Sequence, residues 1–343
     1  MTLEPSEWPV LVTGAGGFVG GHVARHLAGL GHPVIGLARR DPITRPFDPA
    51  TIAWQIGDLR DPEVRRRALA GVRGVVHSAG WVSLAADPKG EARAINVDAT
   101  RALLEDASAA GVERFVHTST LHTLAAGTAE HPANEDTPWN LGAVDSPYAR
   151  TKREAEAIVL GGTDRLAGVV LCPGMVIGPR DTKPTSTRLL LALSRRRTTA
   201  VPPGGIPLVD TGVVARAHRG AIERGEPGRR YAVVGPYKSY PELARMVGMI
   251  TSRPSRVYTF PEGFRGVARG VAGLIDAMAR GRLIDISRAS VSGGFLRLHV
   301  DGSRANALFE LVHPSPLNSI HAALDDASRF GRAPWIKRLR APG

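Results

Sequence analysis

The sequence predicts an α/β fold in which helices cover both faces of a doubly wound, parallel sheet. Two observations lead to this prediction. Between residues 9 and 178, short apolar runs rich in Val alternate with segments whose apolar residues recur at helical spacing. A glycine-rich turn directly follows the first apolar run. Regular alternation of strand and helix is typical of right-handed β–α–β units, which build a parallel sheet.

The apolar runs are expected to be buried strands and the segments between them helices. The strands are expected over residues 10–14, 33–39, 52–58, 74–80, 114–120 and 167–174. The helices are expected over residues 18–31, 61–72, 99–111 and 146–162. These elements define a dinucleotide-binding, Rossmann-type domain over residues 8–178.

The pattern is looser after Pro179. Residues 179–188 and 198–212 are rich in Pro, Gly and Thr and are expected to be loops, whereas residues 239–250 and 319–331 have helical spacing. We expect a smaller, partly helical substrate lobe over residues 179–340, with some elements returning to the main sheet. The amphipathic segment 263–286 is expected to be a lid or core helix rather than a membrane-surface helix.

Composition excludes several classes of protein. A single cysteine, Cys172, rules out a disulfide framework and a cysteine-rich zinc site, and it is expected to be a buried small side chain. The 11 histidines have no metal-ligand spacing, so no metal is expected. The net charge of +12 comes from dispersed arginines with only 5% aromatic residues, which disfavours nucleic-acid binding. No signal peptide or membrane span is visible, and a cytoplasmic protein is expected.

The glycine turn places Gly14, Gly17 and Gly20 between the first strand and the first helix, within "TGAGGFVG". The first glycine permits a tight turn, the second lets the backbone approach a pyrophosphate, and the third allows close helix–strand packing. Phe18 and Val19 begin the helix, whose free N–H groups favour an anion. The turn therefore predicts a dinucleotide site.

The end of the second strand indicates which dinucleotide is bound. An NAD site has a carboxylate here, but this chain has Ala38 followed by Arg39 and Arg40. Guanidinium groups match a 2′-phosphate, so NADP is the preferred prediction. NAD stays possible because Asp41 follows at once.

Further cofactor contacts are expected where the third to fifth strands end. Asp58 is expected to accept from the adenine amino group while Leu59 packs on the ring, the alternative being that Asp58 simply caps the next helix. The small residues of "HSAG", Ser78, Ala79 and Gly80, let the backbone pass close to a ribose. Thr118 ends the fifth strand.

A hydroxyl, a phenol and an amine are predicted at the same edge of the sheet. Thr120 follows the fifth strand, and Tyr148 and Lys152 are four residues apart on one helix face. Carbonyl reduction by a nicotinamide needs a proton as well as a hydride. A nearby ammonium and the positive oxidised nicotinamide are expected to lower the pKa of Tyr148, while Thr120 holds the substrate oxygen.

The chain resembles the extended short-chain dehydrogenase/reductase family, also known as the NAD-dependent epimerase/dehydratase family. The resemblance rests on "TGAGGFVG", "GDLRD", "VVHSAG", "NVDAT", "HTST", "YARTK" and "CPGMVIGPRD", in this order over essentially the whole chain. "HTSTLHTLA", "EDTPWN" and "GPRDTKPTST" are most similar to the dihydroflavonol-4-reductase-like and 3β-hydroxysteroid-dehydrogenase-like branches. The resemblance implies that Thr120, Tyr148 and Lys152 are catalytic. It also implies that Asp58, Leu59, Pro173 and Val176 touch the cofactor.

Departures from the family pattern favour a reductase over other family chemistry. Leu121 and His122 stand where dehydratases of the family have an acidic pair, and no Arg precedes "LVD" to clamp a substrate diphosphate. We therefore expect an oxidoreductase that interconverts a ketone and a secondary alcohol on a small or medium-sized hydrophobic substrate. The alternatives are an NAD-dependent sugar or nucleotide-sugar epimerase and a non-catalytic dinucleotide-sensing protein.

A few residues are candidates for the substrate pocket. Trp81, Val82 and Ser83 follow "HSAG" directly, and His122 lies two residues after Thr120. For each of them ordinary packing or a loop position is the alternative. The helices over 99–111 and 146–162 are expected to form the bundle of a homodimer, if the protein dimerises.

Overall fold

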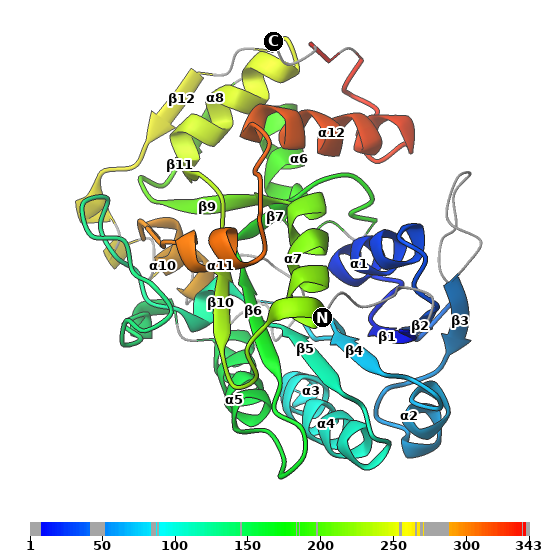
Figure 1. Ribbon diagram of the computed structural model, residues 1–343. Helices are drawn as coiled ribbons and strands as arrows, with labels where there is room; N and C mark the ends of the chain where they lie inside the picture. The colour runs from blue at the N-terminus through cyan, green and yellow to red at the C-terminus, as the bar shows by residue number, and fades with distance from the viewer. Residues whose placement is uncertain are drawn as a thin grey trace.

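The main sheet has seven parallel strands in the order β10-β6-β5-β4-β1-β2-β3 (Figure 1). It is seen in a computed structural model, which describes residues 8–41, 52–83, 87, 89–144, 146–182, 184, 186–196, 198–253, 256–264, 266–267, 270, 288–337 and 339–340. The strands are β1 Val10–Thr13, β2 Val34–Ala38, β3 Ile52–Ile56, β4 Gly74–His77, β5 Arg114–Thr118, β6 Val169–Pro173 and β10 Arg230–Val233. The predicted Rossmann-type α/β fold is confirmed, with a strand in each predicted position.

The chain reverses its direction of travel across the sheet between β1 and β4. From β1 it adds β2 and β3 on one side, and then β4, β5, β6 and β10 on the other. Ligands of open α/β sheets bind at the carboxyl ends of the strands at such a switch point. The residues that end β1 and β4 are therefore the ones to inspect for a site.

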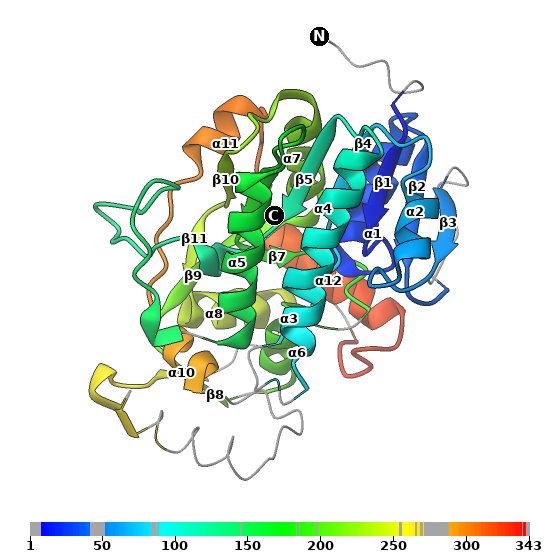
Figure 2. The ribbon, with the colours of Figure 1, turned by 90° about the horizontal axis from the view of Figure 1, so that it is seen from below.

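Helices cover both faces of the sheet because alternate strand residues point to opposite faces. On β1, Val10 and Val12 pack with α1 (Phe18–Gly29) and α7 (Thr211–Arg224), which contact each other. Leu11 packs on the other face with α4 (Ala99–Ala109) and α5 (Pro147–Gly161), which lie side by side (Figure 2). α2 (Pro62–Ala68), α3 (Glu91–Arg93) and the π-helical segment η2 (Ala94–Asp98) precede α4.

Two strands occupy a region that the sequence predicts to be loop, residues 198–212. They are β8 (Thr198–Val201) and β9 (Gly205–Asp210). The prediction was wrong because Pro202, Pro203 and Gly204 form only a short connection between two strands, and are not part of one long loop. β9 is paired on both sides, antiparallel to β11 (Tyr237–Ser239) and parallel to β7 (Met175–Ile177), whereas β8 pairs with β12 (Arg256–Thr259).

Further helices follow β7 in the chain. They are α6 (Thr187–Arg195), α8 (Tyr240–Ile250), α10 (Arg288–Gly294), α11 (Ser303–Leu308) and α12 (Pro316–Arg329). The chain also forms 3-10 turns, η3 (Leu121–Thr123), η4 (Gly142–Val144) and η5 (Glu262–Phe264). α6 contacts both α8 and α12 (Figure 1). Of the region 179–188 that is predicted to be a loop, Thr187 and Arg188 belong to α6. Most of the expected helix over 263–286 lies outside the described residues.

Within the described residues, no helix combines the length and the apolar character that a membrane crossing requires.

Candidate active site

The glycine turn lies at the switch point and touches the end of β4. Gly14 has a positive φ of 68°, and a Cβ there would lie 2.8 Å from the backbone nitrogen of Ala79. A Cβ at Gly20 would lie 2.5 Å from the carbonyl oxygen of Gly14. Side chains at either position are therefore excluded. Gly17 caps α1 without a side chain, which leaves the N-terminus of α1 accessible to a pyrophosphate.

The residues predicted to bind the adenosine end follow β2 and β3. Arg39, Arg40 and Asp41 are exposed after β2. Asp58 follows β3 and accepts hydrogen bonds from the backbone and guanidinium of Arg60 at 2.9 and 2.6 Å. These bonds, with Arg39 nearby, lower the pKa of Asp58 to about 2. Asp58 is thus a stable anion next to two arginines.

The alternative role for Asp58, as a helix cap, is wrong. Asp61 caps α2, and its carboxylate accepts from the backbone nitrogen of Glu63 at 2.9 Å. Leu59 is buried in the core on the α4 and α5 face.

Thr120 lies just beyond β5 and caps the 3-10 turn η3. Its hydroxyl lies 3.3 Å from Nδ1 of His122 and accepts from the backbone nitrogen of His122 at 3.4 Å. The side chain of Tyr148 lies close enough to this hydroxyl for Thr120 to oppose the rise of its pKa. The hydroxyl groups of Thr120, just after β5, and of Tyr148, on α5, therefore lie near each other at the carboxyl edge of the sheet.

Tyr148 and Lys152 lie in the first turns of α5. Ser146 caps this helix by accepting from the backbone nitrogen of Ala149 at 3.1 Å, and Pro147 occupies the first helical position. Burial raises the pKa of Tyr148, and the nearby side chain of Thr120 opposes this rise. The protein groups alone therefore raise the pKa of Tyr148, whereas the sequence predicts a lowered pKa for Tyr148 next to an ammonium and an oxidised nicotinamide.

Lys152 is only 5% exposed, although it carries an amine. Nζ donates to the carbonyl oxygen of Thr118 at 2.7 Å and lies 2.9 Å from Nε2 of His117. Burial lowers the pKa of Lys152 to about 8, opposed by Glu156 and Cys172. The amine of Lys152 therefore loses its positive charge as the pH rises through about 8.

A directed chain of hydrogen bonds ends at Ser78. Burial lowers the pKa of His218 to about 4, so its imidazole is neutral, and Nδ1 donates to the carbonyl oxygen of Val214 at 2.8 Å. Nε2 must then accept from Thr118 at 2.8 Å, and Thr118 must accept from Ser78 at 2.6 Å. The Ser78 hydroxyl therefore presents only lone pairs to a ligand.

The backbone of Ala79 is held by a second buried histidine. Burial lowers the pKa of His77 to about 3, and its ring links Thr13 and Thr100 at 2.8 Å each. Because Thr100 donates to the carbonyl oxygen of Asn96, His77 accepts from Thr13, which in turn accepts from the nitrogen of Ala79 at 3.2 Å.

Asn96 fixes the chain just after "HSAG". Its side-chain oxygen accepts from the nitrogen of Trp81 at 2.7 Å, and its amide donates to the carbonyl oxygen of Trp81 at 3.1 Å. A Cβ at Gly80 would lie 3.2 Å from the same side-chain oxygen. Asn96 also donates to Thr151 on α5 at 3.0 Å. It therefore couples this loop to the helix of Tyr148 and Lys152.

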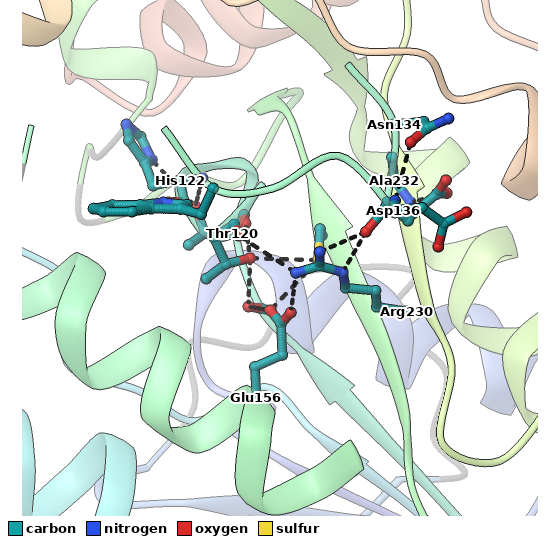
Figure 3. Close-up of polar contacts among 12 residues, drawn as sticks. Thr120, His122, Asn134, Asp136, Glu156, Arg230 and Ala232 are labelled. Carbon is teal, nitrogen blue, oxygen red and sulfur yellow. Dashed lines mark hydrogen bonds and ion pairs between the residues drawn. The ribbon is translucent and has the colours of Figure 1, made fainter. Parts of the chain in front are cut away.

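A partly buried ion pair holds the segment that precedes Thr120. Arg230 on β10 donates to Glu156 at 2.9 Å and to the carbonyl oxygen of Glu135 at 2.9 Å. Figure 3 shows Arg230 between Glu156 and the segment with Asn134 and Asp136. Ser119, which directly precedes Thr120, donates to the other oxygen of Glu156 at 2.8 Å.

The predicted substrate residues are only partly brought together. His122 lies next to Thr120, and its carbonyl oxygen accepts from the indole of Trp139 at 3.1 Å. Trp81 and Ser83 are half-buried, and Val82 is 59% exposed. Of the remaining predicted cofactor residues, Phe18 and Val19 are half-buried at the start of α1, and Pro173 and Val176 are buried at β6 and β7.

Several supporting residues were missed in the sequence, namely His77, Asn96, His117, Glu156, His218 and Arg230. Two of them could have been found in the sequence, because Asn96 lies in the motif "NVDAT" and Glu156 lies one helical turn after Lys152. The histidines gave none, because a histidine in a strand pattern does not indicate its partner. Cys172 is buried, as predicted. Among the described residues, no group of three or more His, Cys, Asp or Glu could hold a metal ion.

The sequence profile of the NAD dependent epimerase/dehydratase family matches residues 10–219. The chain belongs to this family. Sterol demethylase protein B of Methylococcus capsulatus is 30% identical over 274 residues, which cover 79% of this chain and 82% of the relative. The putative dihydroflavonol 4-reductase of Synechocystis sp. is 30% identical over 270 residues, covering 76% and 78%. The predicted resemblance is thus confirmed.

A solved structure of the same fold is the UDP-glucose 4-epimerase of Thermus thermophilus in complex with NAD. It has a TM-score of 0.72 and 22% identity, and covers 93% of this chain and 98% of its own. At this identity the likeness shows only the fold. The shared fold therefore does not determine which reaction this epimerase/dehydratase-family protein catalyses, and that depends on the residues of its own site.

Proposed function

We propose that this chain is an NADP-preferring oxidoreductase that interconverts a ketone and a secondary alcohol on a small, hydrophobic substrate. The observation that carries the proposal is that Thr120 and Tyr148 lie near each other at the carboxyl end of the sheet, on the same side as the buried amine of Lys152, which donates to the carbonyl oxygen of Thr118. The three groups lie at the edge of the sheet to which the glycine turn belongs. This arrangement supports a role for Thr120 and Tyr148 as hydrogen-bond donors to a carbonyl oxygen that lies next to a bound dinucleotide.

The residues of the glycine turn fit a dinucleotide. A pyrophosphate would be held by the N-terminus of α1, a ribose by Ser78 and Lys152, and a 2′-phosphate by Arg39 and Arg40. The cofactor, when bound, supplies or accepts the hydride. Asp58 would accept from the adenine amino group.

The protein groups handle the proton. Thr120 donates a hydrogen bond to the substrate oxygen and so orients the carbonyl. Tyr148 donates its proton to that oxygen during reduction, and its raised pKa keeps it protonated beforehand. The ammonium of Lys152 stabilises the tyrosinate that remains. In oxidation the same tyrosinate accepts the proton.

A hydrophobic substrate is supported by the side chains near Thr120 and by the relatives. His122 lies beside Thr120 and accepts from Trp139, and Leu121 stands where an acidic group would serve dehydration. Two relatives are named for action on a sterol and a dihydroflavonol. The solved epimerase is named for UDP-glucose, but only its fold is shared.

The test is turnover of a panel of sterol, flavonoid and simple aliphatic ketones with NADPH and with NADH. We expect turnover with NADPH, and a loss of about 100-fold or more in kcat for Tyr148→Phe, because general acid catalysis is removed. A variant that kept full turnover would show that Tyr148 is not the acid. Tightly bound NAD together with epimerisation of a sugar nucleotide would indicate an epimerase. Cofactor binding without turnover of either class would indicate a sensor.

A further inference from the structure

We propose that His117 is a positioning residue whose Nε2 accepts a hydrogen bond from Lys152 and fixes the amine against the end of β5. Its catalytic meaning rests on the proposed function, but the contact itself does not. Nε2 of His117 and the carbonyl oxygen of Thr118 lie 2.9 and 2.7 Å from Nζ of Lys152. Two consecutive residues of β5 thus provide two acceptors for one amine.

Strand alternation places His117 on the correct face. Phe115 packs on the α4 and α5 face of the sheet and Val116 on the opposite face. His117 therefore points towards α5 and Lys152, whereas Thr118 points towards α7 and His218. Of these two consecutive residues of β5, His117 therefore contacts the amine of Lys152, and Thr118 joins the hydrogen bonds that link His218 to Ser78.

The protonation state of His117 follows from its surroundings. Burial lowers the pKa of His117 well below its ordinary value, and Lys152, His77 and His218 act in the same direction. A neutral ring that accepts through Nε2 carries its hydrogen on Nδ1. Nδ1 is buried and has no hydrogen-bond partner among the described residues. Such an unsatisfied group costs stability, so this side chain is a poor choice for packing alone.

A neutral acceptor can hold the ammonium of Lys152 without cancelling its positive charge, which a carboxylate would do. An acidic partner would hold the ammonium but would also cancel its field at the Tyr148 oxygen. Within the described residues Lys152 is in no ion pair. The groups that act on it are Glu156 on α5, which Ser119 and Arg230 already engage, and the Cys172 thiol on β6. His77 on β4 is close enough for Lys152 to lower its pKa, and Tyr148 lies one turn before Lys152 on α5.

Direct titration of the amine can test the proposal, because the chain has only five lysines: Lys89, Lys152, Lys183, Lys238 and Lys337. Protein labelled with 13C and 15N in lysine would be titrated by NMR, and Lys152→Arg assigns the signal. In His117→Leu, which removes the acceptor, we expect the Lys152 midpoint to fall by about one pH unit or more. In His117→Gln, whose amide oxygen can accept, we expect it to stay within about 0.3 unit of the wild type. His32→Leu, another buried histidine, serves as the control.

An unchanged Lys152 midpoint in folded His117→Leu would overturn the proposal. Should that variant not fold, the imidazole nitrogens of wild-type His117 decide the question, since the proposal requires the Nδ1–H form at neutral pH. The Nε2–H form there would overturn it. A wild-type protein without ketone turnover would refute the proposed function and leave both NMR measurements valid. For an active enzyme, the alkaline limb of kcat/KM should move with the lysine midpoint in His117→Leu and return in His117→Gln.

Discussion

The buried carboxylate of Glu156 and the guanidinium of Arg230, whose side chain is 27% exposed, form an ion pair at 2.9 Å, across 74 residues of sequence. Glu156 lies one turn after Lys152 on α5, and Ser119 donates to it from the residue before Thr120. Arg230 begins β10 at the edge of the main sheet. The pair therefore ties the helix of Tyr148 and the strand end of Thr120 to a segment far along the chain.

Arg230→Met should lower the free energy of unfolding by about 3–5 kcal/mol, because it leaves the carboxylate of Glu156 buried without its cation. Urea denaturation at neutral pH measures the loss. Arg229→Met is the matched control, since Arg229 pairs with Glu226 at 3.6 Å and both are well exposed. That change should cost less than about 1 kcal/mol. Equal losses in the two variants would contradict a special role for the partly buried pair.

The sequence predicted the part of the site that depends on local spacing. The four-residue interval between Tyr148 and Lys152 places both on one helix face, and the glycine turn requires a strand before it and a helix after it. Glu156 lies on the same face of α5, yet its partner Arg230 comes from a strand that the sequence pattern did not show. Long-range partners of this kind leave no periodic signal.

The prediction failed where turn residues lie inside sheet structure. Residues 198–212 contain β8 and β9, which the prolines and glycines between them concealed. The buried histidines were missed for a different reason. Their roles depend on which strand and helix lie opposite, such as β5 against α5 for His117 and α7 against β5 for His218.

Lys152 should make stability rise with pH above about 8. Its folded-state pKa of about 8 lies below its ordinary value of about 10.4, so the unfolded chain binds more protons between these pH values. The unfolding free energy of the wild type, minus that of Lys152→Met, should increase by about 2 kcal/mol from pH 7.5 to 9.5. Urea unfolding of both proteins at each pH measures this difference. A difference that is flat with pH would show that the folded-state pKa is not depressed.

His218→Phe should weaken cofactor binding indirectly, because His218 acts through Thr118 on Ser78. The change removes the acceptor of Thr118, so that Ser78 is no longer held with its lone pairs towards a ligand hydroxyl. Loss of about one hydrogen bond predicts a rise of roughly 5–10-fold in the Kd for NADPH, measured by calorimetry. His32→Phe is the control, because His32 is also buried and contacts the carbonyl oxygen of Trp8. An equal rise in both variants would attribute the effect to general loss of packing.

Arg39→Ala should weaken NADPH binding by about 10–100-fold and NADH binding by less than about 3-fold, because only NADPH carries the 2′-phosphate. Arg39 is exposed after β2, close enough to Asp58 to lower the pKa of that carboxyl. Calorimetric titration with both cofactors at one fixed salt concentration measures the ratio, since salt screens exposed charges. Arg66→Ala, which removes an exposed arginine paired with Glu63 on α2, should change neither affinity. If Arg39→Ala weakened both cofactors equally, Arg39 would act on the shared adenosine through Asp58, and the preference for NADP would lose its structural basis.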